Sequence, residues 1–224
     1  MDYQKPLQVR AYESLKDMIL EGHLENGQIY SETKISQELG ISRTPLRDAI
    51  QRLAQERYID VIPSKGFRLH EMTEKDLLET FQIRCALEGF CVVQLARDHE
   101  KPEAKRVIRT LESLLRDQES IIGTTDSIED FSAYDQEFHE RIIGYCENSS
   151  ITSLFRTYIY QIGKQTRLSL QPPGRLAETV KEHTAIVESL KTGSVEQSYL
   201  ATMAHLERPK QIIETLGIMQ PHEL

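Results

Sequence analysis

The sequence predicts a mostly α-helical protein with a small N-terminal domain, residues 1–72, and a larger antiparallel all-α helical bundle, residues 73–224. Apolar residues recur at helical spacing through most of the 224-residue chain. The two β-prone runs, 58–62 and 67–70, are short and adjacent, and residues 63–66 between them are typical of a hairpin turn. Only helical patterns follow this hairpin, so we place the domain boundary just after it.

Composition and charge limit the classes of protein to which this chain can belong. Hydrophobic residues make up 39% and charged residues 28%, the ordinary balance of a globular protein with a sizeable core. We find no apolar run of membrane-spanning length and no signal-peptide core at the N-terminus. The cysteines Cys85, Cys91 and Cys146 form no CxxC pattern, and their odd number argues against a disulfide framework. We therefore expect a reduced, cytoplasmic protein with no membrane partner.

The net charge of −8 is distributed unevenly along the chain. Residues 1–72 carry 10 Lys and Arg against 11 Asp and Glu, whereas residues 73–224 carry 17 against 24. Within residues 43–68, six basic residues stand against three acidic ones. A local basic patch on an acidic protein is compatible with DNA binding through that patch, with strong dependence on salt and little general adhesion.

The N-terminal domain begins with three predicted helices. The first covers residues 7–22, where apolar side chains recur at helical spacing. Ile35 and Leu39 share one face of a short second helix, which Gly40 ends in a left-handed conformation. Ser42 suits the N-cap of the third helix, which buries an apolar stripe. That stripe consists of Leu46, Ala49, Ile50 and Leu53.

The third helix directs basic and polar side chains away from its buried stripe. Arg43 and Arg47 lie four residues apart, with Thr44 and Gln51 beside them. A helix, a tight glycine turn and a helix that presents arginines form a helix-turn-helix, and a hairpin directly after it makes a winged helix. Isolated arginines are more often a solvated helix face, but here the cap, the stripe and the hairpin all favour DNA contact. The arginine fork matches guanine O6 and N7 in the major groove.

The hairpin tip offers two further candidate DNA contacts, Lys65 and Gly66, the latter because glycine lets a backbone come close to DNA. The run GISRTPLRDAIQRLAQERYIDVIPSKGFRL resembles the winged-helix domain of GntR-type bacterial transcriptional regulators. This resemblance implies that Arg43 and Arg47 contact base edges and phosphates, with Thr44 and Gly66 in support. Family members often carry an arginine early in the second helix, where this chain has Thr33.

The second domain shows six helical segments separated by proline, glycine and asparagine. Thr73 and Asp76 form a start signal for the first of them. Six helices with short connections make an antiparallel bundle the expected architecture. The predicted helices cover residues 73–97, 102–120, 126–146, 149–170, 174–191 and 194–216.

One constellation in the bundle has the composition of a metal site. Asp135 and His139 are four residues apart and so lie on one face of one helix, while His183 and His205 lie on two other helices. If the inner faces converge, one carboxylate and three imidazoles surround a point, a set suited to a divalent transition metal with positions left for water or ligand. The alternatives from spacing alone are a surface Asp–His ion pair and ordinary core histidines.

The helical half resembles the FCD effector domain of the FadR subgroup of GntR regulators, and its six helices resemble the VanR-type branch. Many such domains bind zinc, nickel or manganese through an aspartate and three histidines. The resemblance therefore implies a divalent metal, with zinc as the first expectation, at Asp135, His139, His183 and His205. The segments that carry the likeness are IRCALE at 83–88, DQEFH at 135–139, EN at 147–148, EHTAIVESL at 182–190 and AHL at 204–206.

Arg84 is the predicted effector-binding residue. One interpretation is an ordinary helix ion pair with Glu88, four residues on. The other is that Arg84 points into the bundle and holds a ligand carboxylate in bidentate fashion. The resemblance favours this second interpretation, because FCD effectors are commonly small organic acids. Other residues that the sequence leaves open for the pocket are Arg141, Arg156, Arg167, Tyr134, Tyr158 and Tyr160.

Together these patterns predict a ligand-responsive transcriptional regulator, a homodimer that binds a pseudo-palindromic double-stranded DNA operator and senses a small carboxylate metabolite. Symmetric dimers match palindromes, and half-site spacing makes DNA affinity sensitive to the placement of the two winged helices. Repression released by ligand is the commoner habit of the family that the chain resembles. Two alternatives stay open: a metalloenzyme with a DNA-binding appendage, using Glu137, Glu140 or Glu182 as base, and a constitutive DNA binder with a structural metal.

Overall fold

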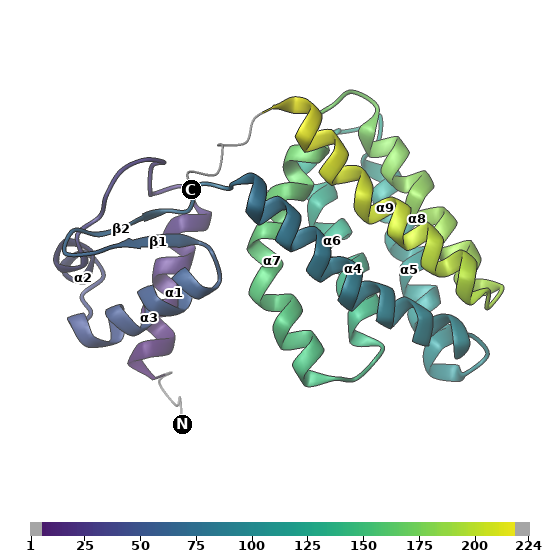
Figure 1. The fold of residues 1–224 in the computed structure, drawn as a ribbon, viewed down its shortest axis with the longest axis horizontal. Helices are drawn as coiled ribbons and strands as arrows, with labels where there is room; N and C mark the ends of the chain where they lie inside the picture. Colours follow the sequence, from purple (N-terminus) through teal and green to yellow (C-terminus); the bar gives the residue numbers. More distant parts are fainter. Residues whose placement is uncertain (1–5, 218–224) are drawn as a thin grey trace. The chain divides into compact units, whose positions relative to one another are not determined.

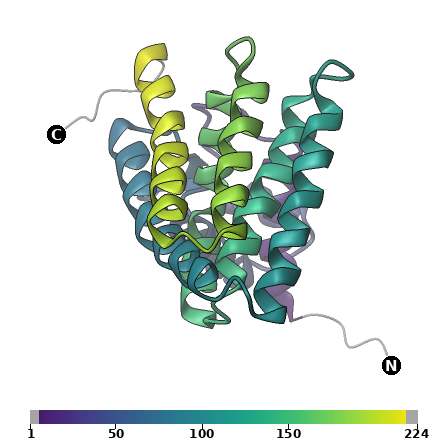
Figure 2. The same ribbon diagram turned by 90° about the vertical axis from the view of Figure 1, so that its right-hand side faces the viewer.

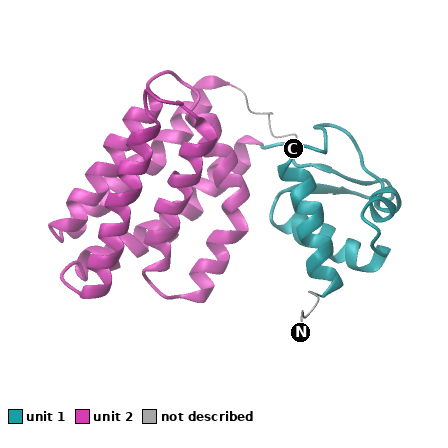
Figure 3. Cartoon of the chain, turned by 180° about the vertical axis from the view of Figure 1, so that it is seen from behind, with its two compact units in different colours: residues 1–72 teal, residues 73–224 magenta. Residues whose placement is uncertain are grey.

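The structure, a computed structural model, describes residues 6–217 and divides the chain into two compact units, Met1–Met72 and Thr73–Leu224 (Figure 3). Within the described residues the chain forms nine helices and one two-stranded sheet, so the predicted mostly helical fold is confirmed. No helix in that part of the chain is both long and apolar enough to span a membrane.

The N-terminal unit consists of three helices followed by a hairpin (Figure 1). Its elements are α1 (Leu7–Leu20), α2 (Glu32–Glu38), α3 (Arg43–Gln55), β1 (Ile59–Ile62) and β2 (Gly66–Leu69). Helix α3 packs on α1 and α2, and its predicted apolar stripe is buried. Gly40 lies between α2 and α3 with a φ of 61°, as the helix-turn-helix requires. Ser42 occupies the N-cap of α3, although its side chain makes no capping hydrogen bond.

The hairpin is tied to the rest of its unit through Tyr30. Strands β1 and β2 pair antiparallel and end with Ile62 opposite Gly66. Tyr30 bridges to Phe67 through two backbone hydrogen bonds of 2.7 and 3.0 Å. Gly66 has a φ of 130°, and a Cβ there would lie 2.0 Å from the Tyr30 carbonyl oxygen. Only glycine fits where the two backbones touch, so Gly66 has a packing role beside its predicted place at the DNA.

The C-terminal unit consists of six helices that run side by side (Figure 1, Figure 2). They are α4 (Glu74–Arg97), α5 (Pro102–Ile121), α6 (Ile128–Gly144), α7 (Ser149–Ser169), α8 (Arg175–Lys191) and α9 (Val195–Leu216). Helix α4 packs against α6, α7 and α9, and α5 packs against α6 and α8. The predicted start of α4 is a capping box, in which Thr73 and Asp76 each accept from the other's backbone N–H at 3.2 and 2.9 Å.

The interior of the bundle has an apolar part and a polar part. The apolar core draws on α4, α5, α6, α7 and α8, and includes Leu95, Leu111 and Phe155. At Phe138, whose ring stacks on the His183 ring, this core meets buried polar side chains that come from all six helices. Buried charges destabilise a fold unless they are paired. A cluster of them in the interior is therefore a candidate functional site.

Candidate metal centre and nucleic-acid interface

The outer face of α3 carries the four residues that were predicted to contact DNA from this helix. Arg43, Thr44, Arg47 and Gln51 are all exposed, whereas the opposite face of the helix is buried against α1 and α2. A helix with one buried face and two solvent-exposed arginines on the other is suited to enter a major groove.

A hollow of about 360 Å³ lies between the start of α2, the start of α3 and the hairpin tip. Its lining includes Arg43, Arg47, Lys65 and Gly66, so the structure brings together four of the six predicted DNA contacts. The other two, both on α3, lie outside it. Three basic side chains and one acidic one, Glu32, line this concave surface, and basic side chains so placed are suited to meet the phosphates of DNA.

Arg47 is paired with an acidic residue from the neighbouring helix, which the sequence analysis did not anticipate. Its Nε and Nη2 donate to Glu32 Oε2 at 3.3 and 3.0 Å. The Arg47 side chain is 58% exposed and that of Glu32 20% exposed, so the pair is screened by solvent and adds little stability. Its effect is on orientation, because it holds the guanidinium at the edge of the hollow.

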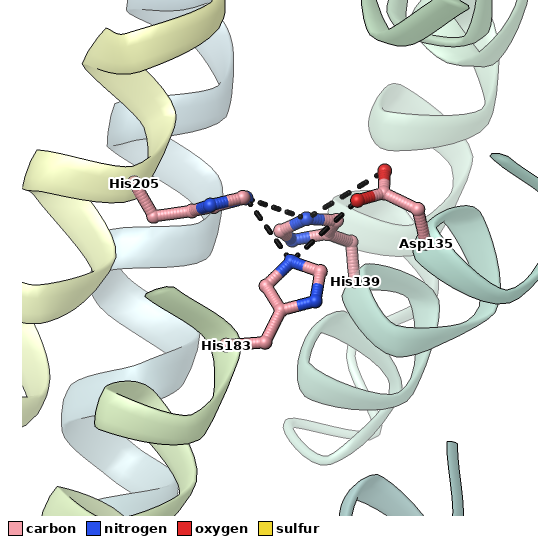
Figure 4. Close-up of side chains that lie close together, drawn as sticks. All are labelled: Asp135, His139, His183 and His205. Carbon is pink, nitrogen blue, oxygen red and sulfur yellow. Dashed lines mark hydrogen bonds and ion pairs between the residues drawn. The ribbon is translucent and has the colours of Figure 1, made fainter. Parts of the chain in front are cut away.

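Figure 4 shows that Asp135, His139, His183 and His205 point toward one another inside the bundle. Asp135 and His139 come from α6, His183 from α8 and His205 from α9, and each is at most 4% exposed. One candidate ligand atom from each residue lies within 4.8 Å of all the others. The structure therefore brings the four predicted residues together, and their burial rules out a surface Asp–His ion pair.

The Nε2 atoms of the three histidines converge. The Nε2 of His205 lies 3.1 Å from that of His139 and 3.3 Å from that of His183. Asp135 places Oδ1 at 3.5 Å from His183 Nε2 and Oδ2 at 4.0 Å from His139 Nε2. Atoms bonded to one transition-metal ion at about 2.0–2.2 Å stand roughly 3.0–3.5 Å apart, so these separations suit such an ion.

Each imidazole is oriented by an acceptor on its other ring nitrogen. Because a carboxylate or an amide oxygen only accepts, each Nδ1 carries the hydrogen and donates it. Each Nε2 lone pair therefore faces the centre, where three lone pairs repel one another unless a cation lies between them. The Nδ1 contacts are His139 to Glu88 Oε2 at 2.5 Å, His183 to Gln118 Oε1 at 2.9 Å and His205 to Glu182 Oε2 at 2.9 Å.

Burial and charge shift the pKa values of two of the histidines and of the two glutamates that accept from the cluster. Burial, with the repulsion of the neighbouring cations, lowers the pKa of His183 well below its ordinary value. Burial also lowers the pKa of His205. For Glu88 and Glu182 burial raises the pKa, but the adjacent arginine and histidine outweigh it and bring the pKa to about 2. Neutral imidazoles and ionised carboxylates are the states that a metal site and its supporting acceptors require.

Arg84 lies inside the bundle and is paired at the same time. Its Nε donates to Glu88 Oε1 at 2.6 Å, and Glu88 in turn holds His139. Arg84 is buried, and its Nη2 has no hydrogen-bond partner among the residues that the structure describes. The ion-pair interpretation of Arg84 is confirmed, whereas the ligand-binding interpretation stays a prediction, for which the unpartnered Nη2 leaves a donor.

The other arginines left open for the pocket belong to other surfaces. Arg141 and Arg156 line a hollow of about 470 Å³ between α6 and α7, which none of the four cluster residues lines. Arg167 is 38% exposed and lies 4.0 Å from Glu129. Of these four arginines, Arg84 alone contacts a residue that holds a member of the cluster, because Glu88 accepts from His139. Arg84 is therefore the better candidate for a ligand at the cluster.

Two residues that support the cluster, Arg175 and Gln118, were not predicted from the sequence. Arg175 is buried and donates from Nη1 and Nη2 to the two carboxylate oxygens of Glu182 at 2.6 and 2.8 Å. The seven-residue spacing of this pair, two helical turns, was a signal that could have found it. Nothing in the sequence marks Gln118, whose partner His183 lies 65 residues away.

Each unit matches a known domain family. Residues 7–69 match the bacterial regulatory proteins of the gntR family, and residues 79–208 match the FCD domain. The chain is 27% identical to the HTH-type transcriptional regulator YdhC of Bacillus subtilis, over 96% of both chains. It is 29% identical to the gluconate operon transcriptional repressor of the same organism, over 81% of this chain and 71% of that one.

A solved structure supports the same fold. Escherichia coli McbR/YncC superposes with a TM-score of 0.73 at 20% identity, over 95% of this chain and 99% of that one. A winged helix that presents arginines, joined to a helical unit with a buried polar centre, defines a DNA-binding transcriptional regulator. The chain belongs to the GntR family of bacterial regulatory proteins, and its larger unit is an FCD domain, a domain type that often binds metal.

Proposed function

We propose that this protein is a transcriptional repressor that binds a pseudo-palindromic operator as a homodimer and responds to a small carboxylate metabolite. GntR regulators bind DNA operators and often act as dimers. One relative is named as the repressor of a gluconate operon, which supports repression as the sign of regulation. A regulator of this kind works in the bacterial cytoplasm, where its operator lies.

The DNA contacts in this proposal come from α3 and the hairpin. Arg43 and Arg47 read base edges and hold phosphates, and Thr44 and Gln51 contact the adjoining backbone or bases. Lys65, with Gly66 behind it, contacts the backbone or the minor groove from the hairpin tip. The exposed face of α3 and the basic lining of the hollow support this assignment.

The metal in this proposal is a divalent transition metal held by Asp135, His139, His183 and His205, with zinc expected first and nickel or manganese as alternatives. The observation that carries it is the convergence of three Nε2 lone pairs, each fixed by a donated Nδ1–H, in a buried space. When bound, such an ion supplies a positive centre that an anionic group can reach.

The effector in this proposal places its carboxylate between the metal centre and the free edge of Arg84. Two further buried hydroxyls have no partner among the described residues, those of Ser132 and Ser198. Ser132 precedes Asp135 by one helical turn, and Ser198 precedes His205 by two turns, so both lie on the helix faces that carry the ligands. Stripping the metal then weakens effector binding, and the effector strengthens metal retention by the same factor.

Metal analysis tests the proposal directly. Protein purified without chelators should carry about one equivalent of a divalent transition metal per chain, measured by mass spectrometry of the metal and by calorimetric titration with zinc and nickel. Asp135→Ala combined with His139→Ala should lose it. Glu21→Ala combined with His23→Ala removes an exposed acid–histidine pair and should keep it. Wild-type protein that takes up no metal in either experiment contradicts the metal site.

Catalysis is the second candidate function, and two observations weigh against it. The relatives that the chain matches are named as transcriptional regulators. Of the three glutamates considered as a base, Glu182 already binds Arg175 and His205, while Glu137 and Glu140 line the outer hollow. Incubation with candidate acids separates the two, because an enzyme consumes the acid and a sensor returns it. A constitutive DNA binder instead shows the same operator affinity with and without acid.

A further inference from the structure

The three acceptors that orient the histidines differ in charge. Glu88 and Glu182 are carboxylates, and each is neutralised by its own buried arginine, Arg84 at 2.6 Å and Arg175 at 2.6 and 2.8 Å. The third acceptor, Gln118, is a neutral amide. All three are in direct contact with a candidate ligand, so their charges act on the centre at close range and in a poorly solvated space.

The charges around the centre therefore do not cancel when a divalent ion is added. The two arginine–glutamate pairs are neutral as pairs, and the three imidazoles contribute no charge. Asp135 supplies one negative charge against two positive charges on the ion. One positive charge is left in the interior of the bundle, and a buried charge without a partner is costly.

The orientation of His183 does not by itself explain a glutamine at position 118. Its Oε1 accepts from His183, but its Nε2 is buried and has no hydrogen-bond partner among the described residues. A stranded amide N–H costs about 1–3 kcal/mol. A glutamate of the same shape would keep and strengthen the contact with His183, and its second oxygen would take the place of the unpaired N–H as a buried atom without a partner. What glutamine provides and glutamate does not is the absence of a negative charge.

We propose that Gln118 sets the net charge of the metal centre, so that the centre carries one positive charge and accepts a ligand group with one negative charge. This inference rests on the proposed metal function. Gln118 acts through His183 and through its lack of charge, and it touches neither metal nor effector, which makes it a positioning residue. The effector class it implies presents a single ionised oxygen-donor group, a monocarboxylate end, to the centre.

The test uses full-length protein loaded with cobalt(II), whose visible absorption reports its surroundings, with acetate as the anionic probe and acetamide as the neutral one. Gln118→Glu cancels the excess charge, so cobalt should bind about 10-fold or more tightly and acetate about 10-fold or more weakly. Glu182→Gln adds to the excess charge, so acetate should bind more tightly and cobalt more weakly. Acetamide should bind all forms equally weakly.

Two control variants separate charge from hydrogen bonding and from general acidity. Gln118→Leu removes the hydrogen bond without changing charge, so cobalt binding should weaken while the preference for acetate over acetamide persists. Gln197→Glu adds a negative charge at an exposed position of α9 and should change neither affinity. Wild-type protein that takes up no cobalt overturns the metal function and this inference together. Equal acetate affinity in cobalt-loaded wild type, Gln118→Glu and Glu182→Gln overturns this inference alone.

Discussion

At the scale of single residues, the buried polar side chains of the bundle are organised as chains of contacts. Arg84 donates to Glu88, which accepts from His139, and Arg175 donates to Glu182, which accepts from His205. Removal of a glutamate strands a buried arginine and takes the acceptor from a histidine, and breaking such a buried ion pair costs about 3–5 kcal/mol. These contacts therefore constrain substitution even at positions that touch no ligand.

The pH dependence of metal-free protein follows from these buried groups. The folded-state pKa is lowered for His183, His205, Glu88 and Glu182, so the unfolded chain takes up protons first as the pH falls. Their stabilising effect is complete above about pH 6.5 and is lost on acidification, first through the histidines and below about pH 4.5 through the carboxylates.

Thermal melting of metal-stripped protein from pH 7.5 to 5.5 should therefore show a falling transition temperature for the C-terminal unit. His183→Gln should reduce that fall, because it removes one of the titrating groups. His23→Gln, at an exposed position, should leave the fall unchanged. A transition temperature that rises on acidification would contradict this assignment.

The proposed DNA contacts of Arg43 and Arg47 give the second prediction at this scale. Arg43→Ala and Arg47→Ala should each weaken binding to a selected operator by about 1–3 kcal/mol, because each removes a forked donor to base or phosphate. Arg109→Ala, at an exposed position of α5, is the matched control and should have no effect. Fluorescence anisotropy at fixed salt measures the affinities, and circular dichroism checks the fold. Correctly folded variants with wild-type affinity would contradict the proposal that α3 contacts the operator.

At the scale of elements, the hairpin is positioned by a backbone contact. Gly66 and Tyr30 touch so closely that no side chain fits between them. Gly66→Ala should destabilise the N-terminal unit by more than about 2 kcal/mol and weaken DNA binding, since the hairpin must move away from α2 and α3. Gly22→Ala also places a side chain at a positive φ, 75° against 130° at Gly66, but with open space around it, and should cost only about 1 kcal/mol.

Urea unfolding of the N-terminal unit, followed by circular dichroism, measures both glycine variants. Equal destabilisation by Gly66→Ala and Gly22→Ala would show that the close contact with Tyr30 adds nothing to the cost of a positive φ. In that case the operator affinity of Gly66→Ala should also stay at the wild-type level.

Whether a feature could be predicted depends on how far apart in the sequence its interacting residues lie. The helices, the hairpin and the capping box at Thr73 follow from signals within a few residues. Asp135 and His139 were visible as a pair for the same reason, four residues apart on one helix. Gln118 meets His183 across 65 residues, and Glu32 meets Arg47 across 15, so both contacts depend on how helices pack, which periodicity does not specify.

At the scale of the whole molecule, the two units have separate interiors and different tasks. The N-terminal unit builds its core from α1, α3 and the hairpin, and the C-terminal unit builds its own from the bundle. The proposed metal contacts only the bundle. A ligand that binds one folded unit stabilises that unit by mass action, without stabilising a neighbour whose core it does not touch.

Calorimetric melting of metal-stripped protein, with and without added zinc, should therefore resolve a transition of the C-terminal unit that zinc shifts upward. Zinc at about 100 times its dissociation constant adds about 2.7 kcal/mol, which for a unit of this size is roughly 5–10 °C. The transition of the N-terminal unit should not move. Asp135→Ala with His139→Ala should abolish the shift, and an equal shift of both transitions would refute independent unfolding.

The pairing of Arg47 with Glu32 has a consequence for how the protein searches a chromosome. Random sequence vastly outnumbers operator, and adhesion to it is driven by cations that are free to meet phosphates. In the proposed DNA-binding role, an arginine that already has a carboxylate partner, on a chain of net charge −8, should dissociate quickly from random DNA. The protein should then form many short-lived complexes with random DNA, and a lasting one only where DNA groups bind Arg47 more strongly than Glu32 does.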